Sequence, residues 1–223
     1  MIPSRLRAPL AAAGAALILL LAFPESLGLW PLRLVAAWPG EIGRAVGGLI
    51  FAGRLGPLAL SQASELELRG PAGRQWALAI DLGLLVQLAA GLALFWLAER
   101  PKLARWVLLT LAGAAGLAAI VPPMSAVSAA ELGAALALAL AAASSNEVAP
   151  GLGARFLAGA MVASPIADIR PALLFIGRPL GPVSTLESQS GIPAVIWALL
   201  IAAGVVVGLL LLLRAKPAKV RPA

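Results

Sequence analysis

Residues 76–98 read WALAIDLGLLVQLAAGLALFWLA, and this stretch decides the fold class. Its one charged residue is Asp81, and it is long enough to cross a hydrocarbon layer, since a spanning helix needs about 20 apolar residues. The rest of the chain has the same character, with 61% hydrophobic residues, 12% charged residues and a mean hydropathy of +0.97. A soluble domain is far less apolar. The sequence therefore predicts an integral membrane protein, with membrane lipids as its surroundings.

Similar apolar runs lie on both sides of this stretch. Because lipid leaves an open backbone unsatisfied, each run predicts a helix. We predict an all-α, polytopic transmembrane bundle of about six spans, forming a single membrane domain over residues 1–223. A cleaved signal peptide is the alternative for the first run, which is long and lacks a clear cleavage site before Pro24. The predicted spans are 8–30, 76–98, 106–121, 126–144, 155–176 and 193–213.

Lysine and arginine in the loops predict the orientation, because cytoplasmic loops carry an excess of them. With the N-terminus inside, ten of the 17 basic residues fall on the cytoplasmic side and six on the outer side. Arg170 lies within a span. This distribution predicts a multi-pass protein of a bacterial-type cell inner membrane with both termini in the cytoplasm.

The segment after the first span is the ambiguous part of this map. Residues 45–60 are apolar enough to suggest a seventh crossing, but they include Arg54, Pro57 and several glycines. A crossing there would also place the basic loop 99–105 outside, against the charge rule. We therefore predict an outer interfacial or re-entrant segment over 31–60, followed by an extramembrane loop to residue 75.

Missing residue types exclude several function classes. The chain has no His, Cys or Tyr, so it cannot form imidazole or thiolate metal sites, a Ser-His pair, a catalytic thiol or a disulfide. An intramembrane aspartyl protease using Asp81 and Asp168 is disfavoured, since neither follows a Gly-x-Gly sequence. The basic residues lie between apolar runs and not along one face, which argues against nucleic acid. We predict no cofactor, no metal and no enzyme activity.

Polar residues inside the spans form the candidate site, because ionisable groups in hydrocarbon are costly and usually functional. On the span map the ionisable members all fall in the outer half of the membrane, within about 12 Å of span ends at 1.5 Å per residue. Pro165 and Pro171 bracket two of them, as in the broken helices of solute sites. A buried structural ion pair and a wrongly drawn span are the alternatives there. The predicted intramembrane polar site comprises Asp81, Gln87, Glu131, Asp168 and Arg170.

Gln87 lies in a stripe with Gly83 and Gly91, four residues to each side, which predicts close contact between helices. Together these features predict a transporter or permease component that moves a small solute or ion through an outward-facing polar vestibule. The alternative is a noncatalytic membrane subunit or assembly factor of a larger complex. Either function makes other membrane subunits, or further copies of this chain, the expected protein partners.

Overall fold

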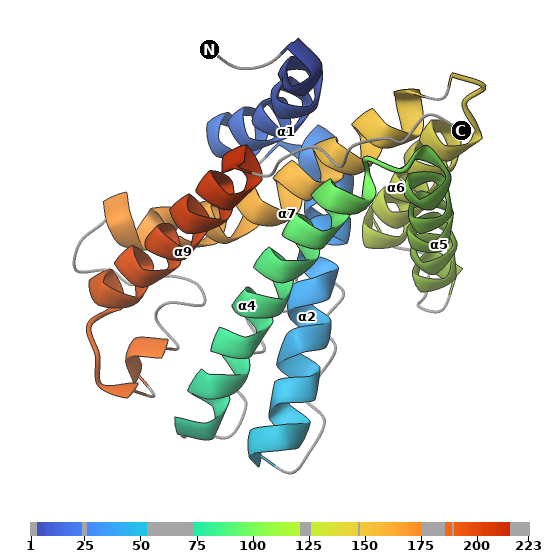
Figure 1. The fold of residues 1–223 in the computed structure, drawn as a ribbon. Helices are drawn as coiled ribbons and strands as arrows, with labels where there is room; N and C mark the ends of the chain where they lie inside the picture. Colours follow the sequence, from blue (N-terminus) through green and yellow to red (C-terminus); the bar gives the residue numbers. More distant parts are fainter. Residues whose placement is uncertain are drawn as a thin grey trace.

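A computed structural model describes residues 4–23, 26–52, 74–120, 126–146, 148–174, 186–188 and 190–214. Within these ranges the regular structure is entirely helical, which confirms the all-α prediction (Figure 1). The helices, in chain order, are α1 Ser4–Ala22, the 3-10 helix η1 Leu27–Leu29, α2 Trp30–Ala52, α4 Arg74–Leu97, α5 Pro101–Ile120, α6 Ala126–Ala143, α7 Val148–Leu174 and α9 Ala194–Arg214.

Three of the six predicted segments coincide within two residues with helices, namely those of α4, α6 and α9. α5 begins five residues before its predicted start at 106, and the other two segments differ more. α1 ends at Ala22, eight residues before the predicted end at residue 30. Pro24 follows in the sequence, and the residue before a proline is biased away from helical geometry. α7 begins at Val148, seven residues before the predicted start at 155, and Pro150 lies in its first turn, where a missing N–H is tolerated.

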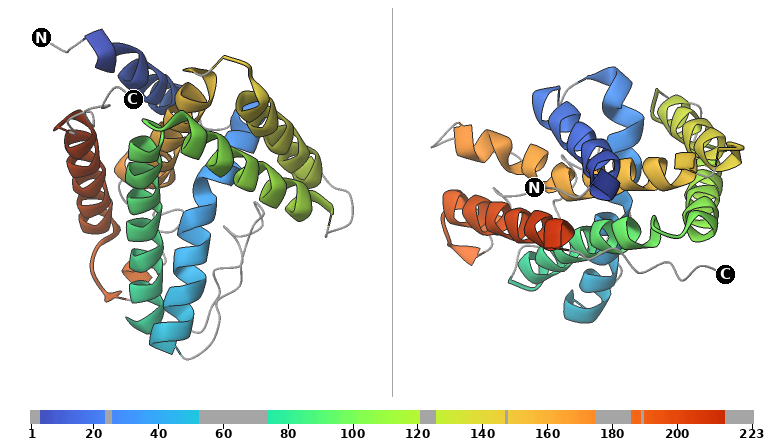
Figure 2. Two further views of the ribbon diagram at one scale, coloured as in Figure 1. Left: turned by 45° about the vertical axis from the view of Figure 1, so that its right-hand side comes forward. Right: turned by 45° about the horizontal axis from the view of Figure 1, so that its top comes forward.

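The segment predicted to be interfacial or re-entrant, residues 31–60, is helical as far as Ala52, within the long helix α2. Its position relative to a membrane stays a prediction. This helix lies antiparallel beside α4, and the two make the most extensive contact of any pair of described helices (Figures 1 and 2). Residues 53–73, which include the predicted extramembrane loop, lie almost wholly outside the described residues.

α7 lies at the centre of the molecule and crosses the α2–α4 pair at a steep angle (Figures 1 and 2). It contacts α1, α2, α4, α5, α6 and α9. The run from Leu157 to Pro165 is buried at every position, so no face of this part of the helix is left to solvent or lipid. A helix that is apolar all round is suited to a core position. The main apolar cluster of the protein is built around it, largely from alanines.

Small residues allow the helices to approach one another closely. At Gly159 of α7, an added Cβ would lie 2.7 Å from the Cα of Ala13, so α1 and α7 meet backbone to backbone. At Gly91 of α4, it would lie 3.2 Å from the carbonyl oxygen of Ala158 in α7. Gly83 packs against α2 in the same way, so the close contact predicted for the glycine stripe of α4 is confirmed.

Membrane crossing is a separate question from helical packing. Within the described ranges, no helix has the combination of length and apolarity that would make it a candidate span. The transmembrane part of the predicted fold class is thus unsupported by these helices. It stays a prediction from the sequence.

Candidate functional site at the contact of α2 and α4

The structure places the predicted polar residues on three helices. Asp81 and Gln87 belong to α4, Glu131 to α6, and Asp168 and Arg170 to α7. The side chains of Asp81, Asp168 and Arg170 lie outside the described residues. The positions of Gln87 and Glu131 are described in full, and the site is built from Gln87 outward.

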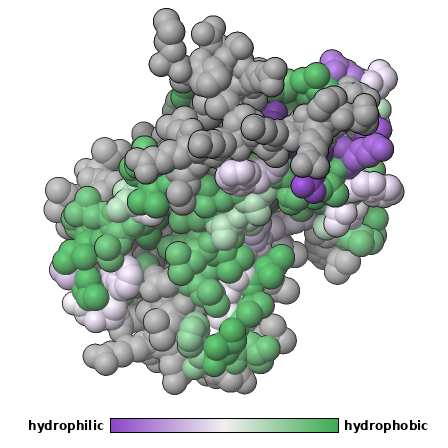
Figure 3. Space-filling view, viewed as in Figure 1, coloured by the Kyte–Doolittle hydropathy of each residue, from purple (hydrophilic) through white to green (hydrophobic). Residues whose placement is uncertain are grey.

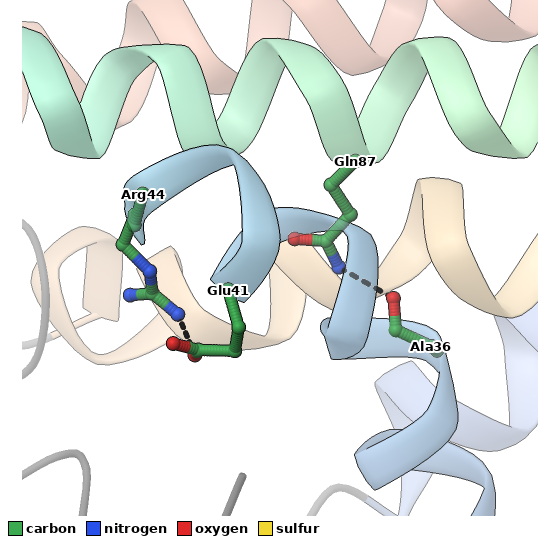
Figure 4. Close-up of polar contacts among 4 residues, drawn as sticks. All are labelled: Ala36, Glu41, Arg44 and Gln87. Carbon is green, nitrogen blue, oxygen red and sulfur yellow. Dashed lines mark hydrogen bonds and ion pairs between the residues drawn. The ribbon is translucent and has the colours of Figure 1, made fainter. Parts of the chain in front are cut away.

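Gln87 connects α4 to the backbone of α2. Its side chain is buried, with 4% of its surface exposed, and its Nε2 donates a hydrogen bond of 3.1 Å to the carbonyl oxygen of Ala36 (Figure 4). Pro39 lies inside α2, has no N–H to donate, and so weakens this turn of the helix. Pro39 removes the helical N–H donor of the Val35 carbonyl, and the amide of Gln87 adds a hydrogen bond at the next carbonyl, that of Ala36.

Glycines bring the two helices together at this level. An added Cβ at Gly40 would lie 2.6 Å from Oε1 of Gln87, and one at Gly43 would lie 2.9 Å from Cα of Gly83. Larger residues at these positions would push the helices apart and carry Gln87 away from α2. Gly83 and Gln87 of the predicted stripe thus face a pair of glycines on α2, whereas Gly91 faces α7.

Glu41 and Arg44, which follow Ala36 by five and eight residues along α2, form an ion pair with their side chains directed toward each other (Figure 4). Glu41 is buried, with 6% of its surface exposed, and the side chain of Arg44 lies over Gly83 of α4. A buried carboxylate needs a partner of this kind, because an unpaired charge in a low-dielectric interior is very unfavourable. Arg44 thus lies against α4, whereas the carboxylate of Glu41 lies on the side of α2 that faces away from α4 (Figure 4).

The indole N–H of Trp38 is a buried donor without a described acceptor. Trp38 is 7% exposed, and its Nε1 has no hydrogen-bond partner among the described residues. Buried indole N–H groups are normally satisfied. Trp38 precedes Glu41 by three residues, so the two are neighbours on the surface of α2. We refer to Trp38, Glu41, Arg44 and Gln87 as the α2–α4 polar cluster.

Glu131 lies on a third helix, α6. Its side chain is 2% exposed, and its Oε2 finds no hydrogen-bond partner in the part of the chain that the structure describes. α6 packs mainly against α5 and also contacts α2, but over the described ranges it hardly touches α4. Glu131 and Gln87 therefore sit on helices that are not neighbours. The single vestibule that joins all five predicted residues stays a prediction.

Three members of the cluster were not among the predicted site residues. Trp38, Glu41 and Arg44 fall in the segment assigned to the outer surface, where Arg44 was counted as a loop charge. Two signals in the sequence point to them. Glu41 and Arg44 are three residues apart, as an ion pair on a helix would be, and Gly40 and Gly43 share a helix face with the spacing of close helix contact.

The chemistry available at the cluster is that of polar recognition. It offers a carboxylate, a guanidinium, an amide and an indole N–H inside an otherwise apolar contact. Among the described residues, no group of three or more carboxylates forms a possible metal site. The arrangement is suited to holding a small polar or charged solute by hydrogen bonds and charge.

Comparison of the chain with models of protein families, with curated proteins and with solved structures finds no match in any of the three.

Proposed function

We propose that this chain is a transporter or permease component of a bacterial-type inner membrane, and that its small solute or ion passes the α2–α4 polar cluster. The observation that carries the proposal is the buried Nε1 of Trp38, which has no hydrogen-bond partner among the described residues and lies on α2 three residues before Glu41 of the Glu41–Arg44 pair. An orphan donor next to a buried carboxylate is a costly arrangement for a helix contact that serves packing alone. A bound solute with an acceptor atom would satisfy it.

Membrane residence is supported by composition and by the surface of the protein. Large apolar side chains are exposed along most helices, including Trp106 at 68%, Leu140 at 64% and Leu199 at 58%. Apolar residues dominate much of the visible described surface (Figure 3). Extended apolar surface of this kind is unfavourable in water and favourable in lipid or against another protein. In α9, the sequence contains no charged residue between Ala194 and Leu213.

The weakened turn of α2 fits a transport site. Ionisable residues inside a membrane usually mark solute or ion pathways. Transporters commonly place such sites where a helix is interrupted and its backbone carbonyls are available. Here Pro39 leaves the carbonyl of Val35 without its N–H donor in α2, and the neighbouring carbonyl of Ala36 accepts a hydrogen bond from the amide of Gln87. Exchange of that amide hydrogen bond for one to the solute is the step that we propose for binding.

Flux through proteoliposomes tests the proposal. The probes are protons, read by entrapped pyranine, and radiolabelled sodium ions and neutral amino acids. We expect wild-type protein to carry at least one of these above the rate of empty liposomes, and Glu41→Gln and Gln87→Leu to lower that flux at least tenfold. Thr110→Val is the control, because Thr110 is exposed on α5 and its hydroxyl donates a hydrogen bond of 2.9 Å to the carbonyl of Trp106 in its own helix.

The second candidate function is a noncatalytic membrane subunit or assembly factor. It is favoured by the exposed leucine row of α6, in which Leu132, Leu136 and Leu140 follow one another every fourth residue on one face. Such a row fits the helix of a partner subunit. Purification in mild detergent separates the two proposals: a stable set of co-purifying subunits, with flux no faster than empty liposomes for every probe, would reject the transporter and support the subunit.

A further inference from the structure

The turn between α4 and α5 carries basic and aromatic side chains that face outward. Arg100, Lys102 and Arg105 are all exposed. Two tryptophans flank them, Trp96 with 45% and Trp106 with 68% of its surface exposed. Leu103 between them is 37% exposed. We call these six residues the α4–α5 basic face.

Contacts with α6 and α7 hold this turn in place. Nη2 of Arg105 donates a hydrogen bond of 3.0 Å to the carbonyl oxygen of Ser144, just after α6. An added Cβ at Gly151 would lie 3.1 Å from the carbonyl oxygen of Ala98, so the start of α7 touches the end of α4. The most hydrophilic residues visible in Figure 3 gather at the upper right, where these turns lie in Figure 1.

Within the described ranges, no acidic side chain is paired with the basic residues of this face. Glu99 is the one acidic residue between Trp96 and Trp106 in the sequence. It is electrostatically coupled to Arg155, whose guanidinium lies 5.9 Å from the ring centroid of Phe95. No salt bridge to Arg100, Lys102 or Arg105 is found among the described residues. Three positive charges therefore remain beside two exposed indoles.

We propose that the α4–α5 basic face binds the headgroups of anionic phospholipids. Guanidinium and ammonium groups are the usual ligands of phosphate, and Trp is the residue that most favours the level of the headgroups. An occupant for this face must offer phosphate or another anion next to apolar material, because Leu103 and both indoles lie among the charges. The surface of an anionic bilayer offers both, because its phosphate headgroups lie directly next to its apolar acyl chains. The inference rests on membrane residence as proposed above, and not on transport.

Quenching of tryptophan fluorescence measures this contact directly. The protein is reconstituted into phosphatidylcholine vesicles that contain either brominated phosphatidylglycerol or, at the same mole fraction, brominated phosphatidylcholine. Bromine quenches only indoles in contact with the labelled lipid. We expect stronger quenching by the phosphatidylglycerol, and we expect the excess to disappear in Trp96→Phe/Trp106→Phe.

Charge variants give the magnitude. Each basic residue near an anionic surface contributes about 1 kcal/mol, so Arg100→Gln/Lys102→Gln/Arg105→Gln should lower the preference for phosphatidylglycerol roughly 100-fold. Arg100→Lys/Arg105→Lys keeps the charge and should retain most of the preference. The lysine variant alters two of the same three positions, so it also controls for misfolding as the cause of the loss in the glutamine variant.

Two results would overturn the proposal. One is equal quenching of the wild-type protein by both brominated lipids. The other is loss of the excess quenching when a single-stranded oligonucleotide or an acidic peptide is added at micromolar concentration, which would assign the face to that class of partner. Absence of solute flux would leave the lipid preference unchanged, so failure of the transport proposal is distinguishable from failure of this one.

Discussion

Replacement of Gly159 by alanine tests the contact on which the position of α1 depends. The added Cβ would lie 2.7 Å from Cα and 2.9 Å from the carbonyl carbon of Ala13. These are backbone atoms, so no change of rotamer relieves the clash and α1 must move away from α7. Gly113→Ala is the matched control, because Gly113 is exposed on α5 and an added Cβ there meets no described atom within 4 Å.

The expected magnitudes follow from two opposing terms. Overpacking a close contact costs about 1–3 kcal/mol, whereas glycine to alanine in a helix gains about 0.5–1 kcal/mol. The helix gain is common to both variants, so the difference between them isolates the contact. We expect Gly113→Ala to raise the free energy of unfolding by about 0.5–1 kcal/mol and Gly159→Ala to lie about 1–3 kcal/mol below it.

Unfolding of both variants in one detergent, followed by tryptophan fluorescence against denaturant, provides the measurement. The chain has six tryptophans, and neither substitution touches one. Equal shifts of the two variants in the same direction would mean that Ala13 does not lie against Gly159, and the arrangement of α1 on α7 would be refuted.

Three further predictions concern the polar residues. Gln87→Leu should lower the free energy of unfolding by about 0.5–1.5 kcal/mol, since it removes the hydrogen bond to Ala36; an unchanged denaturation midpoint would contradict that bond. Glu131→Leu should instead raise it by about 1–3 kcal/mol, because a buried carboxylate oxygen without a described partner is removed; a destabilised variant would show that Glu131 has a partner. Asp168→Asn should abolish proteoliposome flux while the amount of protein in the membrane, measured by immunoblot, is unchanged; a fall in that amount instead would favour the subunit function.

Most helices could be predicted from the sequence because their apolar runs end at charged or turn residues. The run of α4 ends before Glu99 and Arg100, and that of α6 ends before Ser144 and Ser145. Interruption by proline at residue 24 likewise explains why α1 is shorter than its apolar run. The local sequence was sufficient to predict a helix boundary where a charged residue, a serine or a proline directly follows the apolar run.

The packing of α2 against α4 could not be predicted in the same way, because its glycines and charges disfavour a buried helix in isolation but favour close contact with a partner helix. In isolation, Gly40, Glu41, Gly43 and Arg44 weaken the case for a buried helix. Against α4 they have the reverse effect, since Gly43 meets Gly83 and the charges pair with each other. The favourable interpretation depends on a partner some 40 residues away, which no local pattern reveals.

The residues of the candidate site likewise fall into one that could be predicted from its own helix and three that could not. Gln87 could be identified because its own stripe on α4 predicts a helix contact, and the structure confirms that contact. Trp38, Glu41 and Arg44 could not, because their place depends on α2 being packed against α4. Because residues 31–60 were assigned to the outer surface, Arg44 was counted as a loop charge, and its pairing with Glu41 was not predicted.

Membrane crossing is the central claim, and paired single cysteines test it most directly. The chain has no cysteine, so one introduced thiol is the only one present. Lys102 lies in the first turn of α5, and Ser188 lies in the short helical segment 186–188 before α9; both residues are exposed. In Figure 1 the turn from α4 into α5 and the segment before α9 lie on opposite sides of the molecule. A membrane-impermeant maleimide should label Lys102→Cys in inverted inner-membrane vesicles but not in spheroplasts, and Ser188→Cys in spheroplasts but not in inverted vesicles. Labelling of both positions from the same side, or of each position from both sides, would contradict the claim that the chain crosses the membrane between them.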